Sequence, residues 1–393
     1  MTDTTPAAVG TFVLDDGIVV DSLLDLQAQA VARWHAGVRA YVQDGAGSNR
    51  AVRANRVAHE RWALRSRVLR DVSSIDTTTT VLGQRVELPV LIAPSGLHTL
   101  VHPDGEVATA VGARDAGTVM ILSAATGRTI PDVAASGVDL WFQLYWGEDR
   151  GRVRELVQMA DAAGVGALCL TVDMPARPLV GATMRSAITS VAHHLPAYLP
   201  PRTAHLTPGA WDHDTRLTWA DLAWLRDVTS LPIVVKGVMS AEDVAPARDS
   251  GVDAIVVSNH GGRALDTPLG TLDVLPEIAD ELTNGGPELY VDGGFRHGGE
   301  VLAALALGAR AVLIGRPALW ALTLGGARTV TDMLRLLQYQ LEVSMARVGA
   351  TSVAEIDSRI VRRAPAGSSP DEAPHDDSGS GAMSMCTPSS APT

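Results

Sequence analysis

Eight short apolar runs, separated by connectors long enough to form helices, constrain the fold more than any other feature of this chain. Few polar residues interrupt the runs, which indicates strands buried on both faces, and helix-length connectors indicate parallel pairing. The runs cover residues 88–94, 118–124, 140–145, 167–173, 231–237, 253–259, 288–294 and 310–316. Eight such repeats predict an α/β protein built as a TIM (β/α)8 barrel, which presents its reactive side chains at the carboxyl ends of its strands.

The remaining segments are arranged around this barrel. Residues 22–72 begin with helical periodicity and predict an N-terminal helical segment, so the barrel domain is expected to span 22–363, after a flexible stretch at 1–21. The long connection at 174–230 is typical of a lid loop. The tail at 364–393 is rich in Pro, Ser, Gly and Asp, which predicts disorder.

Charge and composition exclude several classes of partner. The net charge of −12 disfavours binding to nucleic acid or to anionic lipid, which leaves a small molecule as the expected partner. Cys169 and Cys386 are too few for a disulfide framework or a zinc site, and Cys169 is expected to be buried filler. The adjacent histidines at 193–194 lack ligand-like spacing, so no metal is expected. No secretory signal and no membrane-spanning run is recognisable, and the expected location is the cytoplasm.

Polar groups follow the second to the eighth apolar run at the points where these runs end. They are Ser123, Gln143, Tyr145, Thr171, Asp173, Lys236, Ser258, His260, Asp292, Gly315 and Arg316. Because the carboxyl ends of parallel barrel strands meet at one face, this arrangement favours a single convergent site over strand ends that are merely solvated.

The last two runs have the composition of a phosphate-binding site. Their ends read "VDGGFRHGGE" and "IGRPALW", in which Gly293, Gly294 and Gly315 would let backbone amides approach an oxyanion while Arg296 and Arg316 add positive charge. Glycines that only serve tight turns are the alternative. Neither a Gly-x-Gly-x-x-Gly pattern after a first strand nor a P-loop lysine is present, so the sequence favours a mononucleotide over a dinucleotide or a nucleoside triphosphate.

Two residues are candidates for chemistry. Lys236 ends a very apolar run and needs an electron-rich partner, such as a flavin that becomes anionic on reduction; a structural carboxylate pair or a Schiff-base lysine is the alternative. His260 is the candidate base, with Asp173 to hold its tautomer and Arg263 to bind a substrate carboxylate.

The motif "SNHGGRALD" at 258–266, together with "AYVQDGAG", "PVLIAPSGLHTLVHPDGE", "FQLY", "LTVD", "VVKG", "VDGGFRHG" and "IGRP", resembles the FMN-dependent α-hydroxy acid oxidase and dehydrogenase family. The resemblance implies FMN, a 2-hydroxy acid substrate, O₂ or another electron acceptor, and a homotetramer. It implies catalytic or substrate-binding roles for Tyr41, Tyr145, Asp173, Lys236, His260 and Arg263. It implies FMN contacts for Pro94, Ser95, Gly96, Ser123, Gln143, Thr171, Lys236, Ser258, Asp292, Gly293, Gly294, Arg296, Gly315 and Arg316.

Three departures from the family pattern concern the substrate and the acceptor. Val180 stands where relatives carry a substrate-binding arginine, which Arg177 or Arg185 would have to replace. Ala125 stands where glycolate oxidase has a tryptophan and lactate oxidase a tyrosine, so the resemblance implies a larger pocket and a bulky, mandelate-like acid. Gly96 is the residue that the dehydrogenases and the monooxygenase of the family tend to carry at this position, where the oxidases tend to have alanine. This indicates an electron acceptor other than O₂, or a product that is retained while the flavin is reoxidised.

The expected reaction is removal of a proton from the substrate by His260 while two electrons pass to the flavin, giving a 2-keto acid. Three alternatives stay open: oxidation of an amine or a peptide-derived metabolite, a non-catalytic flavin-binding partner protein, and a phosphate-binding barrel without flavin.

Overall fold

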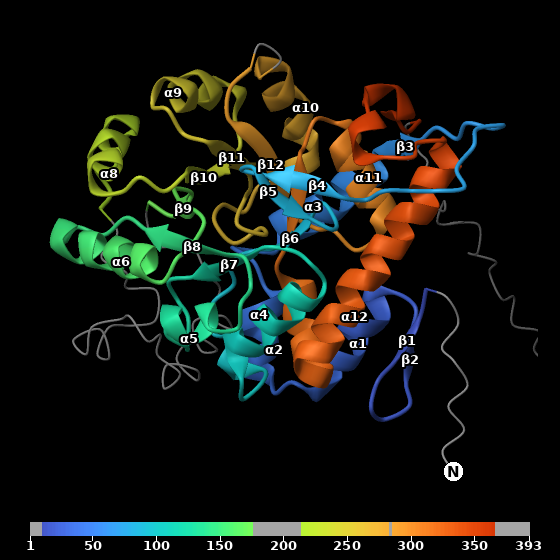
Figure 1. Ribbon diagram of the computed structural model, residues 1–393, viewed down its shortest axis with the longest axis horizontal. Coiled ribbons are helices and arrows are strands. Elements are labelled where there is room, and N and C mark those ends of the chain that lie inside the picture. Colours follow the sequence, from blue (N-terminus) through green and yellow to red (C-terminus); the bar gives the residue numbers. More distant parts are fainter. Residues whose placement is uncertain (1–9, 176–213, 283–284, 366–393) are drawn as a thin grey trace, which may run out of the picture.

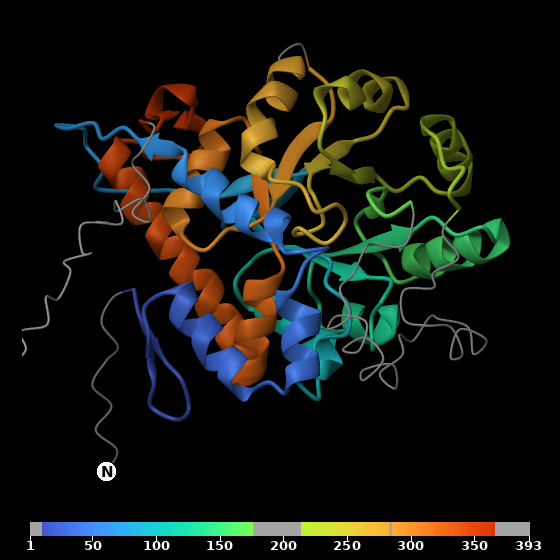
Figure 2. The same cartoon turned by 180° about the vertical axis from the view of Figure 1, so that it is seen from behind.

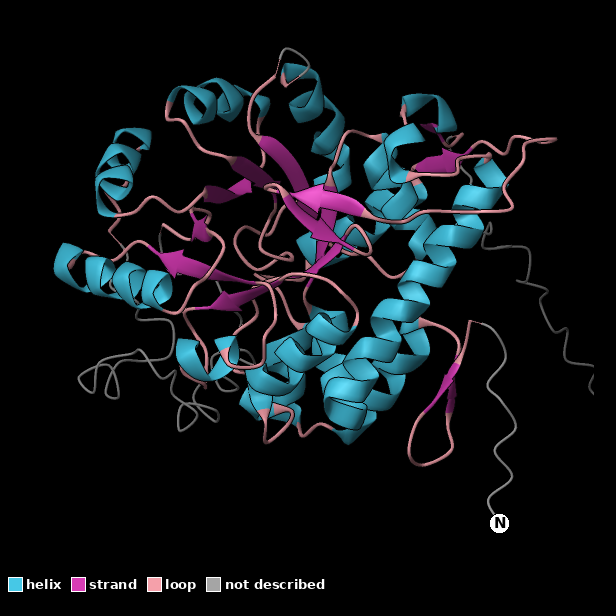
Figure 3. Ribbon diagram, viewed as in Figure 1, coloured by secondary structure: helices cyan, strands magenta, loops and turns pink. Residues whose placement is uncertain are grey.

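A computed structural model describes residues 10–175, 214–282 and 285–365, and within them eight parallel strands close into a barrel (Figure 1 and Figure 3). The strands, in their order around the barrel, are β10 (Ile233–Val238), β11 (Ala254–Val257), β12 (Glu288–Asp292), β13 (Ala311–Ile314), β6 (Val90–Ile92), β7 (Met120–Ser123), β8 (Leu140–Tyr145) and β9 (Leu168–Thr171). Every strand coincides with one of the eight apolar runs, with only β10 ending one residue beyond its run, so the predicted barrel is confirmed.

Helices follow the strands and form the outer layer, as the turned view shows (Figure 2). They are α4 (Gly105–Asp115), α5 (Ile130–Ala134), α6 (Arg150–Ala162), α8 (Leu222–Val228), α9 (Val244–Asp249), α10 (Thr271–Glu281), α11 (Gly298–Ala306) and α12 (Arg316–Val348). The short 3-10 helices are η1 (His98–Leu100), η3 (Trp219–Asp221), η4 (Ala241–Asp243), η5 (Val353–Glu355) and η6 (Ser358–Ile360). Right-handed β–α–β crossovers of this kind place the strands' carboxyl ends on one face.

Alternate strand residues fill the interior of the barrel, because successive side chains of a strand point to opposite faces. The interior cluster includes Leu91, Ile121, Trp141, Cys169, Val234, Val256, Tyr290 and Leu313. Cys169 is fully buried there, as the sequence predicts. The hairpin of β4 (Thr79–Val81) and β5 (Gln84–Val86) closes the amino end of the barrel, since Val81 and Val86 join the same cluster. The interior is therefore packed rather than open, and the carboxyl end is left for a site.

The predicted N-terminal helical segment consists of α1 (Leu23–Arg33), α2 (Ala36–Gln43) and α3 (Arg50–Glu60). Within the range 22–72 the helical pattern ends earlier than expected, because β3 (Trp62–Leu64) pairs antiparallel with β14 (Val361–Arg363). This pairing ties the two ends of the barrel domain together.

The N-terminal boundary also differs from the prediction. Residues 10–21 are not a flexible stretch, since β1 (Phe12–Val13) and β2 (Val19–Val20) form a hairpin that buries Phe12, Leu14 and Val20. The "LDDGI" sequence at 14–18, between the strands, is a turn signal flanked by apolar residues. Part of the expected lid is helical, because η3 and α8 occupy positions within 214–230. The rest of that connection, residues 1–9 and the tail from 366 lie outside the described residues. No helix in the described part of the chain is long and apolar enough to cross a membrane.

Candidate functional site

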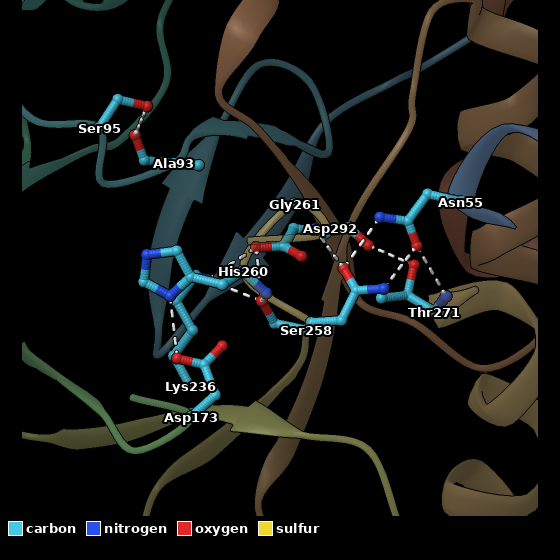
Figure 4. Close-up of polar contacts among 12 residues, drawn as sticks. Asn55, Ala93, Ser95, Asp173, Lys236, Ser258, His260, Gly261, Thr271 and Asp292 are labelled. Carbon is cyan, nitrogen blue, oxygen red and sulfur yellow. Dashed lines mark hydrogen bonds and ion pairs between the residues drawn. The ribbon is translucent and has the colours of Figure 1, made fainter. Parts of the chain in front are cut away.

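His260 and Asp173 meet at the carboxyl end of the barrel although they come from different strand ends (Figure 4). His260 Nδ1 lies 2.9 Å from Asp173 Oδ1, and the exposed fractions of the two side chains are 21% and 7%. Burial would raise the pKa of Asp173, but His260 and then Lys236 lower this pKa overall. An ionised Asp173 therefore accepts from Nδ1 and leaves Nε2 of the imidazole to take a proton.

The backbone around His260 adopts a conformation that L-residues avoid. His260 has a φ of 59°, and Gly261 and Gly262 follow with φ of 63° and 80°. A Cβ atom on Gly262 would lie 2.6 Å from the backbone nitrogen of Val52, at the start of α3. The two glycines are thus required by the left-handed turn and by the closeness of α3, and this turn carries the histidine to the barrel mouth.

Lys236, Ser258 and Asp292 form a buried polar group on neighbouring strand ends (Figure 4). Lys236 Nζ lies 2.8 Å from Asp292 Oδ2 and donates to Ser258 Oγ at 2.7 Å, and Ser258 Oγ donates to Asp292 Oδ2 at 2.8 Å. Burial opposes the charge of Lys236, but Asp292 and Asp173 raise its pKa overall, so it is a cation. The paired lysine does not have the deprotonated amine that a Schiff-base role needs.

Among the buried polar atoms that have no hydrogen-bond partner in the described residues, three belong to residues that the sequence places in the site: Gln143 Nε2, Asp292 Oδ1 and Asp173 Oδ2. Gln143 is held by its other end, since Oε1 accepts from Ser123 Oγ at 3.0 Å and from the Ala124 amide at 3.2 Å. Thr171 is buried at the end of β9, where it pairs in register with Tyr145 of β8. Buried polar groups without partners are costly, so a fixed donor and two fixed acceptors indicate a bound polar group.

The glycine and arginine residues that the sequence singles out after β12 and β13 follow the carboxyl ends of these two strands. Gly293 and Gly294 have φ of 104° and 84°, and Ser95 Oγ is 3.2 Å from where a Cβ of Gly315 would be. Arg296 stacks over Trp320 at 4.5 Å. Burial, and then Arg56 and Arg316, lower the pKa of Arg296 to about 9. Cations that depress one another's pKa favour an anion nearby.

Another cluster of predicted site residues joins Tyr41 of α2 to Arg263 and to the loops that follow β6 and β7. Arg263 Nη1 donates to the carbonyls of Tyr41 at 2.7 Å and Asp44 at 2.9 Å, and its guanidinium lies 5.3 Å from the Tyr41 ring centre. Burial raises the pKa of Tyr41, and also that of Tyr145 at the end of β8, so both hydroxyls stay protonated. A Cβ on Gly96 would lie 3.1 Å from Tyr41 Oη and 2.9 Å from Ala125 Cβ. Pro94 and Ser95 precede this position in the same loop.

The residues that hold the loops at the carboxyl end of the barrel against α3 were not predicted from the sequence. Asn55 and Asn259 exchange side-chain hydrogen bonds at 2.8 and 2.9 Å, and Asn55 Oδ1 also accepts from the Thr271 amide. Asp266 accepts from the Ser48 amide at 2.7 Å. Asn259 and Asp266 belong to the motif at 258–266, which could have drawn attention to them, whereas Asn55 carries no signal in the sequence.

Other predictions fall outside the described residues: Val180, Arg177, Arg185 and the histidine pair at 193–194. Among the residues that are described, no cluster of three or more His, Cys, Asp or Glu side chains could hold a metal ion.

The family model of the FMN-dependent dehydrogenases matches residues 30–363. The chain belongs to this family. An L-lactate oxidase from Nostoc sp. is 42% identical over 340 residues, which cover 82% of this chain and 92% of the relative. The 2-hydroxyacid oxidase 1 of Mus musculus is 38% identical, covering 83% and 92%. A crystal structure of mandelate oxidase superimposes with a TM-score of 0.78 at 36% identity, covering 87% of this chain and 98% of that one.

Membership makes the protein an FMN-dependent oxidoreductase that acts on the CH–OH group of a 2-hydroxy acid. The partnerless atoms of Gln143, Asp292 and Asp173 fit this cofactor and its substrate, because flavin carbonyls accept, ribityl hydroxyls donate, and a hydroxy acid brings a hydroxyl. The similar proteins include oxidases named for small acids, lactate and glycolate, and an oxidase named for an aromatic acid, mandelate. Membership of the family alone therefore does not decide the size of the substrate.

Proposed function

We propose that the protein oxidises a bulky, mandelate-like 2-hydroxy acid to the 2-keto acid. The observation that carries this proposal is Ala125, which lies next to Gly96 near Tyr41 and has only a methyl group where glycolate oxidase has a tryptophan and lactate oxidase a tyrosine. Solved structures of mandelate oxidase, one of them with benzoyl-formic acid, share the fold at 37% identity and a TM-score of 0.77. A substituent on the substrate carbon can occupy the room that small residues leave.

The proposed FMN contacts divide by chemistry. Gln143, Ser123, Thr171 and the loop at 94–96 would hold the ring, and Lys236 would stabilise negative charge at the ring's N1 side. Asp292 would accept from the ribityl chain through Oδ1, and Ser258 would lie beside the chain while its hydroxyl holds Lys236, Asp292 and the His260 amide. The phosphate would bind at Gly293, Gly294, Arg296 and the Gly315–Arg316 backbone at the start of α12. FMN supplies the two-electron acceptor that the side chains of the protein lack.

The side chains would carry the proton and orient the substrate. Tyr41 and Arg263 bind the carboxylate, which leaves the hydroxyl-bearing carbon toward His260. His260 takes a proton through Nε2, and Asp173 stabilises the imidazolium that results. Tyr145 donates to the substrate hydroxyl. The Lys236 ammonium, fixed by Asp292, supplies positive charge without moving.

The test is anaerobic mixing of the flavin-loaded protein with glycolate, L-lactate, mandelate and 4-hydroxymandelate while the oxidised flavin absorbance is followed. We expect mandelate-type acids to bleach the flavin faster than glycolate or L-lactate. The variant Ala125→Tyr, which adds a ring beside Gly96 and Tyr41, should reverse this order. Faster bleaching of the wild type by glycolate or L-lactate would contradict the bulky substrate.

The acceptor is proposed to be O₂, because the named relatives are oxidases. Gly96 has a packing reason that is independent of the acceptor, since a Cβ there would crowd Ala125 and Tyr41. Oxygen consumption during turnover, compared with reduction of an artificial dye, tests this assignment. The homotetramer stays a prediction.

A further inference from the structure

The guanidinium of Arg316 joins two segments that each carry a residue of the proposed active site. Its Nε donates to the Val42 carbonyl at 2.8 Å and its Nη1 to the Gly261 carbonyl at 2.9 Å. Val42 directly follows Tyr41, and Gly261 directly follows His260. Nη2 adds a longer contact of 3.4 Å to the Asp44 carbonyl. One planar group therefore bridges the end of α2 to the left-handed turn that carries the histidine.

The joint around this guanidinium leaves no room for adjustment. Gly261 has a φ of 63°, and a Cβ on it would lie 3.2 Å from Arg316 Nη1. A Cβ on Gly45 would lie 2.4 Å from the Gly262 carbonyl, which already accepts from the Ala46 amide at 2.9 Å. Close packing of this kind turns a change in the bridging side chain into a shift of the backbone.

The hydrogen-bonding pattern separates this role from phosphate binding. Nε and Nη1 of Arg316 and its longer Nη2 contact all go to chain carbonyls, and no salt bridge to a carboxylate involves it in the described part of the chain. Arg263 reinforces the same joint, because its Nη1 donates to the Tyr41 and Asp44 carbonyls. Carbonyls at a helix carboxyl end attract cations. The Arg316 amide and the glycine before it are left to face an anion.

We infer that Arg316 is a positioning residue whose side chain sets the separation between Tyr41 and His260. This inference rests on the proposed function, in which Tyr41 holds the substrate carboxylate and His260 takes the proton. Without the hydrogen bonds of Arg316, the substrate carboxylate bound at Tyr41 and the imidazole of His260 are no longer held at a fixed separation. Misplacement of reacting groups by about 1 Å can cost roughly 10²-fold in rate.

The test is the variant Arg316→Lys in the full-length, flavin-loaded protein. Lysine keeps the positive charge but cannot donate to separate carbonyls in a planar fork. We expect normal FMN content, a flavin reduction rate lower by roughly 10²-fold with the best hydroxy acid, and weaker binding of benzoylformate, a non-reducing 2-keto acid. Binding is followed by the change that benzoylformate makes in the flavin spectrum, so this measurement does not depend on turnover.

Two other variants complete the experiment. Arg53→Lys is the matched control, because Arg53 is exposed on α3 and its guanidinium donates, within the described part of the chain, only to the Ser48 carbonyl; it should behave as the wild type. Gly261→Ala keeps the arginine but disturbs its contact, and it should lower the same two quantities even if Arg316→Lys does not fold. A retained reduction rate in folded Gly261→Ala would then overturn the inference.

Each other outcome also decides the question. Wild-type rate and benzoylformate affinity in Arg316→Lys would overturn the inference, since charge alone would suffice. Loss of FMN, with a normal rate once FMN is saturating, would overturn it in favour of a phosphate contact. A wild-type flavin that no 2-hydroxy acid bleaches would instead contradict the proposed function itself.

Discussion

At the scale of single residues, His260, the proposed base, is also the strained residue of the site, with a φ of 59°. A left-handed conformation costs a non-glycine residue about 1–2 kcal/mol. The structure holds it by fixed contacts: Ser258 Oγ accepts from the His260 amide at 3.1 Å, and Asp173 holds the ring. Strain of this size persists only where the surroundings determine the conformation, which is typical of residues that react.

Replacement of His260 by alanine should leave FMN bound but slow flavin reduction by about 10²–10⁴-fold, the usual contribution of general acid–base catalysis. His260→Asn is the better control for the backbone, because asparagine tolerates the left-handed region. Both variants should be equally slow in anaerobic stopped-flow reduction, whereas a fast His260→Asn would mean that the backbone and not the imidazole matters.

At the scale of elements, the turn between α2 and α3 forms one wall of the site. Arg263 and Arg316 donate to carbonyls at the end of α2, and Asp266 accepts from the amides of Ser48 and Ala51 at the start of α3. The segment that precedes the barrel in the sequence is therefore part of its mouth. The backbone hydrogen bond from Ser48 is the largest influence that lowers the pKa of Asp266 to about 2.

The lowered pKa of Asp266 predicts how its contribution to the stability of the protein depends on pH. The folded-state pKa of Asp266 lies below its ordinary value of 3.8, so its contribution is complete above that value and is lost as pH falls through about 2. Asp266→Asn should lower the free energy of unfolding at pH 7, and the difference from the wild type should shrink between roughly pH 4 and 2. Urea unfolding across this range measures it, and a difference that is equal at every pH would exclude the charge as its cause.

The sequence predicts the elements better than their contacts. The eight runs specify the barrel because a strand buried on both faces must be apolar, and His260, Asp173 and Lys236 are predictable because each ends a run. The Asn55–Asn259 pair is not predictable in this way, since its two side chains lie 204 residues apart in the sequence. The carbonyls bound by Arg316 are not predictable either, since backbone groups carry no residue signal and Val42 lies 274 residues away. The hairpin at 12–20 is missed for a local reason: its strands are only two residues each.

At the scale of the whole molecule, α12 connects the mouth to the far side of the barrel. It begins at Arg316, bends at Gly325 and Gly326, where the backbone leaves helical geometry, and packs against α1, α4 and α11 (Figure 1). The bend lets one chain segment both hold the active-site joint and cover the outer layer. Kinks at paired glycines are an ordinary way to redirect a long helix.

The contact between α4 and α12 gives a prediction about stability that is separate from the chemistry. A Cβ on Gly112 would lie 2.6 Å from Val330 Cβ and 2.7 Å from the Ala327 carbonyl, and the Gly112 carbonyl accepts from Thr331 Oγ1 at 3.2 Å. Alanine favours a helix over glycine by about 1 kcal/mol, but overpacking a tight contact costs about 1–3 kcal/mol.

We therefore expect Gly112→Ala to be destabilised, with a lower Tm, while its flavin reduction rate at 25 °C stays that of the wild type. Gly151→Ala is the control, because Gly151 is exposed in α6 and a Cβ there would meet only the oxygen of the Asp149 carboxylate that caps α6, at 3.1 Å; it should lose less stability than Gly112→Ala. Calorimetry of the three flavin-loaded proteins compares them. A Gly112→Ala variant more stable than the wild type would mean that α4 and α12 move apart without cost. A lower flavin reduction rate in this variant would mean that α12 transmits the change to Arg316 at its other end.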